Sequence, residues 1–106
     1  MAGIAVYSTR FIAESGFTGS AAFLVPDGYR AVVRDIDSVC FTSEGPTIEA
    51  GIGDSAVFWA FTYGVVLLVN AQSWRGRVVL NPGEQLVILT NAPLDFVASG
   101  YLLSLP

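Results

Sequence analysis

The sequence WRGRVVLNPGEQLVIL, residues 74–89, decides the fold. Two runs rich in β-branched and apolar residues flank Asn81-Pro82-Gly83-Glu84. Proline suits the second position of a type II turn, and glycine accepts the positive φ that the third position needs. Two-residue hairpins favour the primed turns instead. We therefore predict a strand–turn–strand unit whose turn is a corner between two packed sheets.

Short runs of apolar and β-branched residues recur between turn signals along the rest of the chain. They predict strands over 4–12, 21–25, 29–42, 47–52, 55–62, 65–70 and 94–105, with loops at 14–16 and 18–20, turns at 26–28, 43–46, 53–54 and 91–93 and a hairpin tip at 63–64. A bulge near Arg34 and Asp35 keeps the apolar side chains of the 29–42 strand in phase. The total of eight to ten short strands without a helix predicts an all-β, single-domain antiparallel β-sandwich, jelly-roll-like, over residues 1–106. Residues 1–12 are predicted to be an N-terminal arm or an edge strand.

The composition indicates a protein that assembles with other protein. Only 13% of the residues are charged, whereas 53% are apolar. The folded surface of a chain this size is roughly 5,700 Å², and so few charges cannot cover it. A monomer would expose large apolar patches, which usually mark protein interfaces.

The same composition argues against several classes of function. The chain has no histidine and no lysine, so a metal site would depend on carboxylates and the single cysteine, Cys40, which we expect to be a small buried residue. A net charge of −4 gives little support for binding nucleic acid. No targeting signal or membrane-spanning run is present. We predict no enzyme, no catalytic, cofactor or metal site, and no nucleic-acid or membrane partner.

The aromatic residues Phe58, Trp59, Phe61 and Tyr63 are the strongest candidates for a contact surface. Neither face of their segment alternates with polar residues, as an outer sheet face does. The segment is therefore either a central strand pair covered by loops or a subunit interface, where aromatic residues are enriched. We predict the interface.

Two charged pairs on predicted strands have more than one interpretation. Arg75 and Arg77 share a strand face and either pair with carboxylates of a neighbouring subunit or remain solvated. Asp35 and Asp37 also share a face. A carboxylate pair can hold calcium or act in hydrolysis, but a solvated or salt-bridged strand face is the simpler explanation.

The last third of the chain is similar to small virion proteins of tailed phages, especially those that infect actinobacteria. In those proteins a W-x-G-R-x-V-x-x-x-G-E/D-x-L strand pair precedes a terminal S-G-Y-x-L. The matching positions here are Trp74, Gly76, Arg77, Val79, Gly83, Glu84, Leu86, Ser99, Gly100, Tyr101 and Leu103. The segment VPDGYRAVV at 25–33 resembles the V-P-x-G-x-x-x-V entry of the same sandwich. These motif residues are structural in character, so no catalytic role is carried over.

The resemblance implies a phage structural protein, with a capsid decoration protein on the outside of the head shell as the first expectation. Such a protein would be assembled in the bacterial host cytoplasm, form a homo-oligomer, expected to be a trimer, and bind the major capsid protein. We assign self-association to Phe58, Trp59, Phe61, Tyr63, Arg75 and Arg77, and shell contact to Ile4, Val6, Tyr7 and Phe11. The alternatives are a head–tail connector or minor tail protein and, from another class, a small carbohydrate-binding module that uses Trp59 or Trp74.

Overall fold

The computed structural model describes residues 6–40, 46–53, 58–66 and 71–106. These residues contain no helix and form six strands. The strands are β1 (Val6–Leu24), β2 (Tyr29–Val39), β3 (Thr47–Gly53), β4 (Phe58–Val65), β5 (Ala71–Leu80) and β6 (Gln85–Ser104). Every pairing between them is antiparallel. The predicted all-β class is confirmed.

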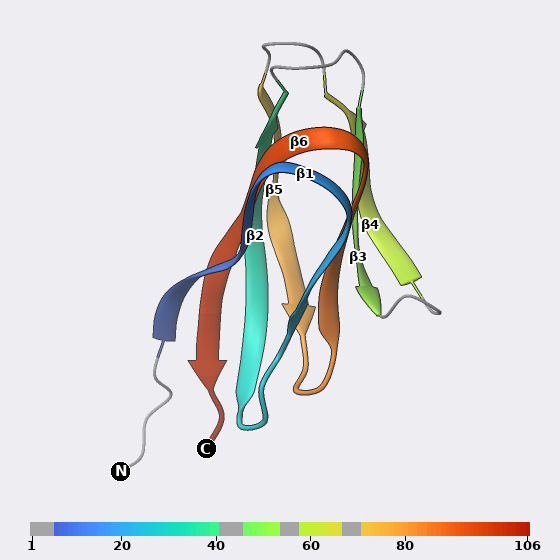
Figure 1. Ribbon diagram of the computed structural model, residues 1–106. Helices are drawn as coiled ribbons and strands as arrows, with labels where there is room; N and C mark the ends of the chain where they lie inside the picture. The colour runs from blue at the N-terminus through green and yellow to red at the C-terminus, as the bar shows by residue number, and fades with distance from the viewer. Residues whose placement is uncertain (1–5, 41–45, 54–57, 67–70) are drawn as a thin grey trace.

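The strands form two packed layers that β1 and β6 join. In the first layer, residues 95–104 of β6 lie between the N-terminal half of β1 and β2, and β5 pairs with the other edge of β2. In the second layer, residues 85–90 of β6 lie between the C-terminal half of β1 and β3, and β4 pairs with the other edge of β3. Figure 1 shows β1 and β6 arching together from one layer to the other.

When each half of β1 and β6 is counted separately, the described chain has eight segments in two four-stranded sheets. We number these segments one to eight along the chain. From edge to edge, the segments of one sheet are then 1, 8, 3 and 6, and those of the other are 2, 7, 4 and 5. This arrangement is jelly-roll-like. The predicted antiparallel β-sandwich is therefore the observed architecture.

The predicted element boundaries were wrong in three places. Residues 14–16, 18–20 and 91–93 are not loops or turns between strands, because they lie within β1 and β6, whose pairing is irregular at the bend and regular on both sides of it. Tyr63 and Gly64 are not a hairpin tip, because β4 continues through them and pairs them with Glu49 and Ile48 of β3.

The bend in β1 depends on glycine and on side chains from β6. Gly16 and Gly19 have φ angles of 59° and 116°, which glycine adopts without the steric cost of a Cβ. Asp95 Oδ1 accepts a hydrogen bond from the Gly16 N–H at 2.6 Å. The Thr90 hydroxyl donates to the Phe17 carbonyl at 3.0 Å and accepts from the Gly19 N–H at 3.2 Å. Side chains of β6 thus replace ladder hydrogen bonds that the bend interrupts.

The predicted corner at Pro82 is confirmed. Glu84 N–H donates to the Asn81 carbonyl at 3.0 Å, Gly83 has a φ of 86°, and the turn carries the chain from β5 in the first layer to β6 in the second. The turn at 26–28 crosses between the same layers. The two corners are bonded together, because Val25 donates to the Glu84 carbonyl at 2.9 Å and accepts from Gly83 at 3.0 Å.

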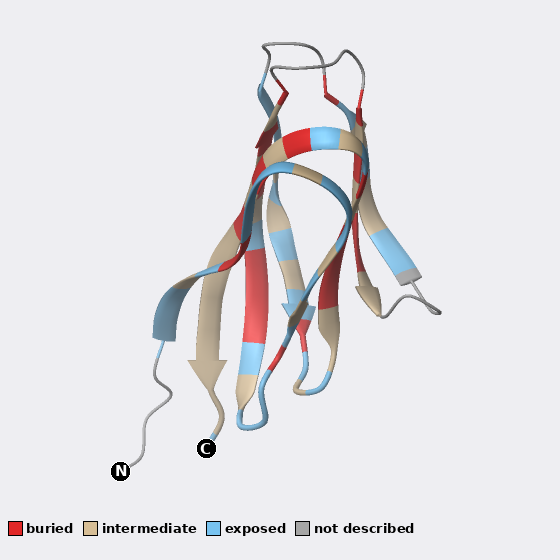
Figure 2. Cartoon of the chain, in the orientation of Figure 1, coloured by how far each residue is buried: buried red, intermediate tan, exposed pale blue. Residues whose placement is uncertain are grey.

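The core lies between the layers and is apolar, and Figure 2 places its buried residues along the middle of the strands. Its largest fully buried side chains are Phe96, Leu80, Leu86, Ile88 and Leu94. The rings of Phe11 and Phe23, from the two halves of β1, lie 5.0 Å apart. Cys40 is buried, as predicted, and its thiol is 3.8 Å from the Pro93 carbonyl oxygen.

Candidate functional site

All five arginines of the chain lie on the outer face of the first layer, and all five are exposed. They are Arg10 on β1, Arg30 and Arg34 on β2, and Arg75 and Arg77 on β5. Asp35, Asp37 and Asp95 share this face, which we call the basic face, and Glu14 lines a hollow on it together with Asp37 and Asp95, so its described charged residues sum to +1. The remaining acidic residues are Asp27, Glu49 and Glu84 and, outside the described part, Glu44 and Asp54; these five contribute −5 to the total of −4.

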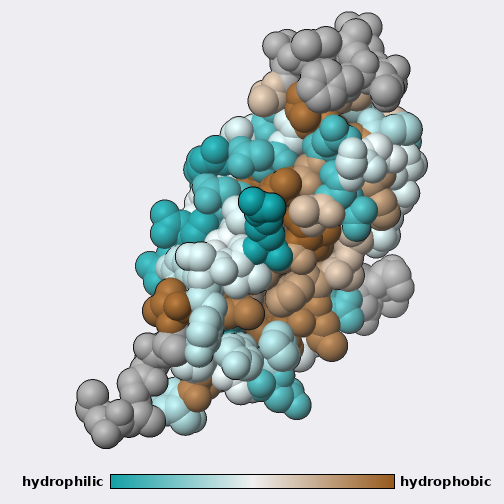
Figure 3. All heavy atoms as spheres, turned by 60° about the vertical axis from the view of Figure 1, so that its left-hand side comes forward, coloured by the Kyte–Doolittle hydropathy of each residue, from teal (hydrophilic) through white to brown (hydrophobic). Residues whose placement is uncertain are grey.

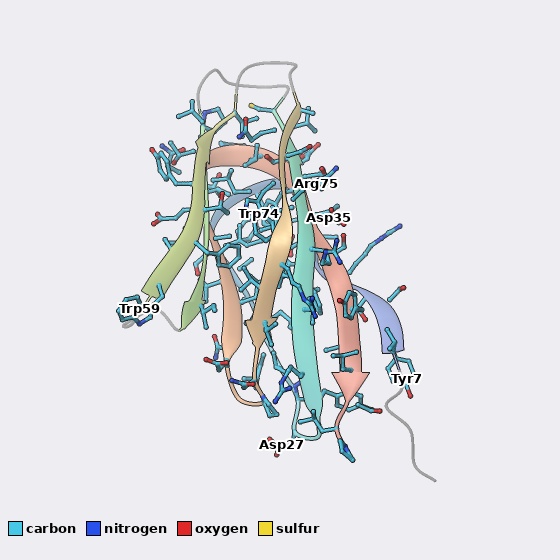
Figure 4. The ribbon with its side chains drawn as sticks, turned by 180° about the vertical axis from the view of Figure 1, so that it is seen from behind. Tyr7, Asp27, Asp35, Trp59, Trp74 and Arg75 are labelled. Carbon is cyan, nitrogen blue, oxygen red and sulfur yellow. The ribbon has the colours of Figure 1, made fainter. Side chains whose placement is uncertain are left out.

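Arg75 forms ion pairs with two carboxylates of its own chain. Its Nε lies 3.1 Å from Asp35 Oδ1, and a terminal nitrogen lies 2.8 Å from Asp37 Oδ1. Figure 4 shows Arg75 and Asp35 close together on β5 and β2. Burial raises the pKa of Asp37, but hydrogen bonds from Arg75 and Ser73 outweigh it, so this pKa lies below its ordinary 3.8. The hydrogen bond to Asp37 raises the pKa of Arg75. The salt-bridged interpretation of Asp35 and Asp37 is confirmed.

The predicted bulge in β2 is also confirmed. The pairing of β2 with both β5 and β6 shifts between Val33 and Asp35. Gly100 of β6 crosses this bulge so closely that a Cβ there would overlap the Val32 carbonyl oxygen. The bulge leaves Arg34 exposed on the outer face.

A shallow hollow of about 530 Å³ lies at this bulge. We call it the arginine hollow, and it is lined by Ser8, Thr9, Arg10, Arg34, Asp35, Ser99, Gly100 and Tyr101. Within the described structure, neither Arg10 nor Arg34 has an ion pair or a side-chain hydrogen bond. The sequence did not identify Arg10 and Arg34 as neighbours. They come together only because β6 forms ladders with β1 on one side and β2 on the other.

Of the four aromatic residues predicted to form an interface, the three whose side chains the structure describes do not make one surface. Trp59 and Tyr63 of β4 are 74% and 63% exposed, and Figure 4 shows Trp59 at the end of the strand. Phe61 is instead packed against Trp74 of β5, with ring centroids 5.1 Å apart. It turns inward because the pairing of β3 with β4 shifts between Ala60 and Thr62. The side chain of Phe58 lies outside the described part.

The outer face of the second layer presents Tyr63 and Val65 beside Glu49, and we call these three residues the Glu49 face. Glu49 pairs with Tyr63 in the β3–β4 ladder, and Val65 is 47% exposed. Among the described residues, Glu49 has no ion pair or side-chain hydrogen bond. Its outward position follows from the alternation of Ile48, Glu49 and Ala50, a signal that the sequence contained.

The residues assigned to shell contact separate into exposed and buried groups. Val6 and Tyr7 are 62% and 50% exposed, and Tyr7 packs edge-on against Tyr29. Phe11 is 8% exposed and belongs to the core, because an irregularity between Arg10 and Ile12 turns it inward. Ile4 lies outside the described residues. On the side of the molecule in Figure 3, apolar atoms gather in a strip along the middle.

Comparison with known proteins finds no matching family model, no matching curated protein and no matching solved structure. In the part of the chain that the structure describes, no helix has the length and hydropathy to cross a membrane, and no three His, Cys, Asp or Glu residues group as metal ligands would. The contact surfaces are therefore the features from which a function is argued.

Proposed function

We propose that this chain is a phage structural protein, an outer capsid decoration protein that stabilises the head shell through contacts between its own copies and with the major capsid protein. The observation that supports this most is the exposure of Trp59, Tyr63 and Val65 on one edge of the sandwich and of Val6 and Tyr7 on the other. Exposed apolar side chains at two separate places suit a subunit that contacts more than one neighbour.

The fold is compatible with this role. Jelly rolls form viral capsid domains and also lectins, so the architecture alone does not choose between them. A stable contact buries roughly 800 Å² on each partner, which is a modest part of the 5935 Å² surface of the chain. Contacts with two neighbouring copies and the shell therefore fit on one molecule.

Self-association and position on the particle test this proposal. Light scattering on the purified chain should show a homo-oligomer, for which we expect a trimer, and a chain that stays monomeric at the highest attainable concentration would contradict it. Density for the chain on the head surface of the particle supports a decoration protein. Density at the neck or tail would instead favour the head–tail connector or minor tail protein.

A carbohydrate-binding module is the second candidate. The 74% exposure of Trp59 favours it, because an open indole face is what sugar rings stack on. Trp74 is less suited, since Phe61 packs against its ring. Binding on a glycan array that Trp59→Ala abolishes would support this function over the structural one.

A further inference from the structure

Among the residues that the structure describes, three charged groups on two opposite surfaces have no partner. Arg10 and Arg34 line the arginine hollow of the first layer, and Glu49 lies on the outer face of the second. None of the three has an ion pair among the described residues. By contrast, Asp35 on the rim of the hollow is already paired with Arg75. The guanidinium groups of Arg10 and Arg34 can therefore bind a carboxylate from outside the chain, because a guanidinium binds a carboxylate through two parallel hydrogen bonds.

We propose that the arginine hollow of one copy binds the Glu49 side chain of a second copy. This inference rests on the self-association in the proposed function and identifies the contact that produces it. The basic face of one subunit lies on the Glu49 face of the next, and Tyr63 and Val65 supply the apolar centre of the contact.

The charge distribution favours a second copy as the occupant. The described charged residues of the basic face sum to +1, while Asp27, Glu49 and Glu84, which the structure describes elsewhere, contribute −3. Two copies therefore attract each other when the basic face of one meets the remaining surface of the other. An acidic chain supplies its own complementary surface, so no foreign partner is needed.

Glu49 is the carboxylate best placed for this contact. Glu84 already accepts a hydrogen bond from the Asn81 N–H at 2.6 Å, and Asp27 lies in the turn between β1 and β2. Glu14 lies beside the bend of β1. Glu49 alone among these four stands on a regular strand face beside exposed apolar side chains.

The contact is heterologous, because the two surfaces that meet are different parts of the chain. Such contacts form a closed ring when the rotation between successive copies closes, and an open fibre when it does not. A closed ring of three is the form that agrees with the expected trimer.

Charge exchange tests the contact. Sedimentation velocity over a concentration series at low salt should show that Arg34→Glu and Glu49→Arg each weaken self-association by at least about tenfold, because like charges then face each other. The Arg34→Glu/Glu49→Arg double variant should recover the wild-type association constant to within about threefold, because the pair is restored in reverse. Arg77→Glu is the matched control, with the same charge change on the same face but outside the hollow; it reduces the charge of the face equally and should therefore weaken association clearly less than Arg34→Glu does.

Each outcome decides a different point. Arg34 and Arg77 are exposed and Glu49 is half-buried on an outer strand face, so circular dichroism should show an unchanged fold in every variant. Wild-type association that neither single variant weakens, or a double variant without rescue, overturns this inference and leaves the proposed function standing. Weakening by Arg34→Glu but not by Glu49→Arg overturns the assignment of Glu49. A wild-type chain that never associates overturns both proposals.

Discussion

Gly100 is the residue on which the geometry of the basic face depends most. It crosses the β2 bulge where a Cβ would overlap the Val32 carbonyl oxygen, and this backbone atom cannot move aside as a flexible side chain can. We expect Gly100→Ala to lower the free energy of unfolding by about 1–3 kcal/mol, the usual cost of overpacking. Urea titration measures it. Ser99→Ala, at the neighbouring half-buried position, should cost less than about 1 kcal/mol. Equal losses in the two variants would contradict the role of the close approach.

The ion pair of Asp37 predicts a small pH dependence of stability. The folded-state pKa of Asp37 is below its ordinary 3.8, so its stabilising contribution is complete above that pH and is lost as the pH falls through the folded-state value. Because Asp37 is 49% exposed, solvent screening keeps the contribution below about 1 kcal/mol. Asp37→Asn should therefore lower the free energy of unfolding at neutral pH, and by a smaller amount at pH 2.

Urea titrations at the two pH values measure this difference. Asp27→Asn is the control, because Asp27 makes no ion pair in the described structure, and it should not change the free energy of unfolding. If Asp37→Asn lost equally much stability at acidic and neutral pH, the cause would be altered packing of the side chain and not the lost charge.

At the scale of elements, β4 and β5 are the ends of the paired sheet and share no ladder with each other. The contact of Phe61 with Trp74, at 5.1 Å between ring centroids, holds them together. Phe61→Ala should lower the free energy of unfolding by about 1–3 kcal/mol, less than for a fully buried phenylalanine because Phe61 is half-buried. Hydrogen exchange should accelerate in β4 more than in β2, which has a paired strand on each side.

The exposed neighbour provides the control for this effect. Tyr63→Ala changes a side chain that is 63% exposed on the same strand, and at a dilution where the chain is monomeric it should leave stability within about 0.5 kcal/mol of the wild type. Faster exchange that is uniform over β2, β4 and β6 in Phe61→Ala would mean that the contact supports the whole sandwich rather than this seam.

Local sequence signals predicted turns and bulges well and long-range continuity poorly. Pro82-Gly83 indicated the corner between sheets, and the phase shift at Arg34 indicated the bulge, because both are set by neighbouring residues. The bends of β1 and β6 were expected to be loops because Gly16, Gly19 and Pro93 are turn residues. Pairing between two distant strands keeps these segments extended, and a local pattern does not report it.

The candidate surfaces show the same division. Trp59 and Tyr63 are exposed and remain candidates for the predicted contact, whereas Phe61 and Phe11 turn inward at irregularities in their ladders. No glycine or proline marks the irregularity between Arg10 and Ile12, whereas Gly51 of β3 lies at the other one, opposite the segment of β4 that contains Phe61. The arginine hollow needs three strands from separate parts of the chain, so only the folded structure assembles it.

At the scale of the whole molecule, the expected trimer predicts a defined end to assembly. As the concentration increases, the molar mass measured by light scattering should rise from the 11.2 kDa of one chain to a plateau near three times that mass. The plateau follows because a ring satisfies every copy of both contact surfaces, whereas a fibre always leaves one of each surface open for the next copy. Added salt should lower the association constant, because the proposed contact pairs exposed charges, while the plateau mass should stay the same. A mass that keeps rising with concentration would contradict the ring, and it would assign the same two surfaces to an open array.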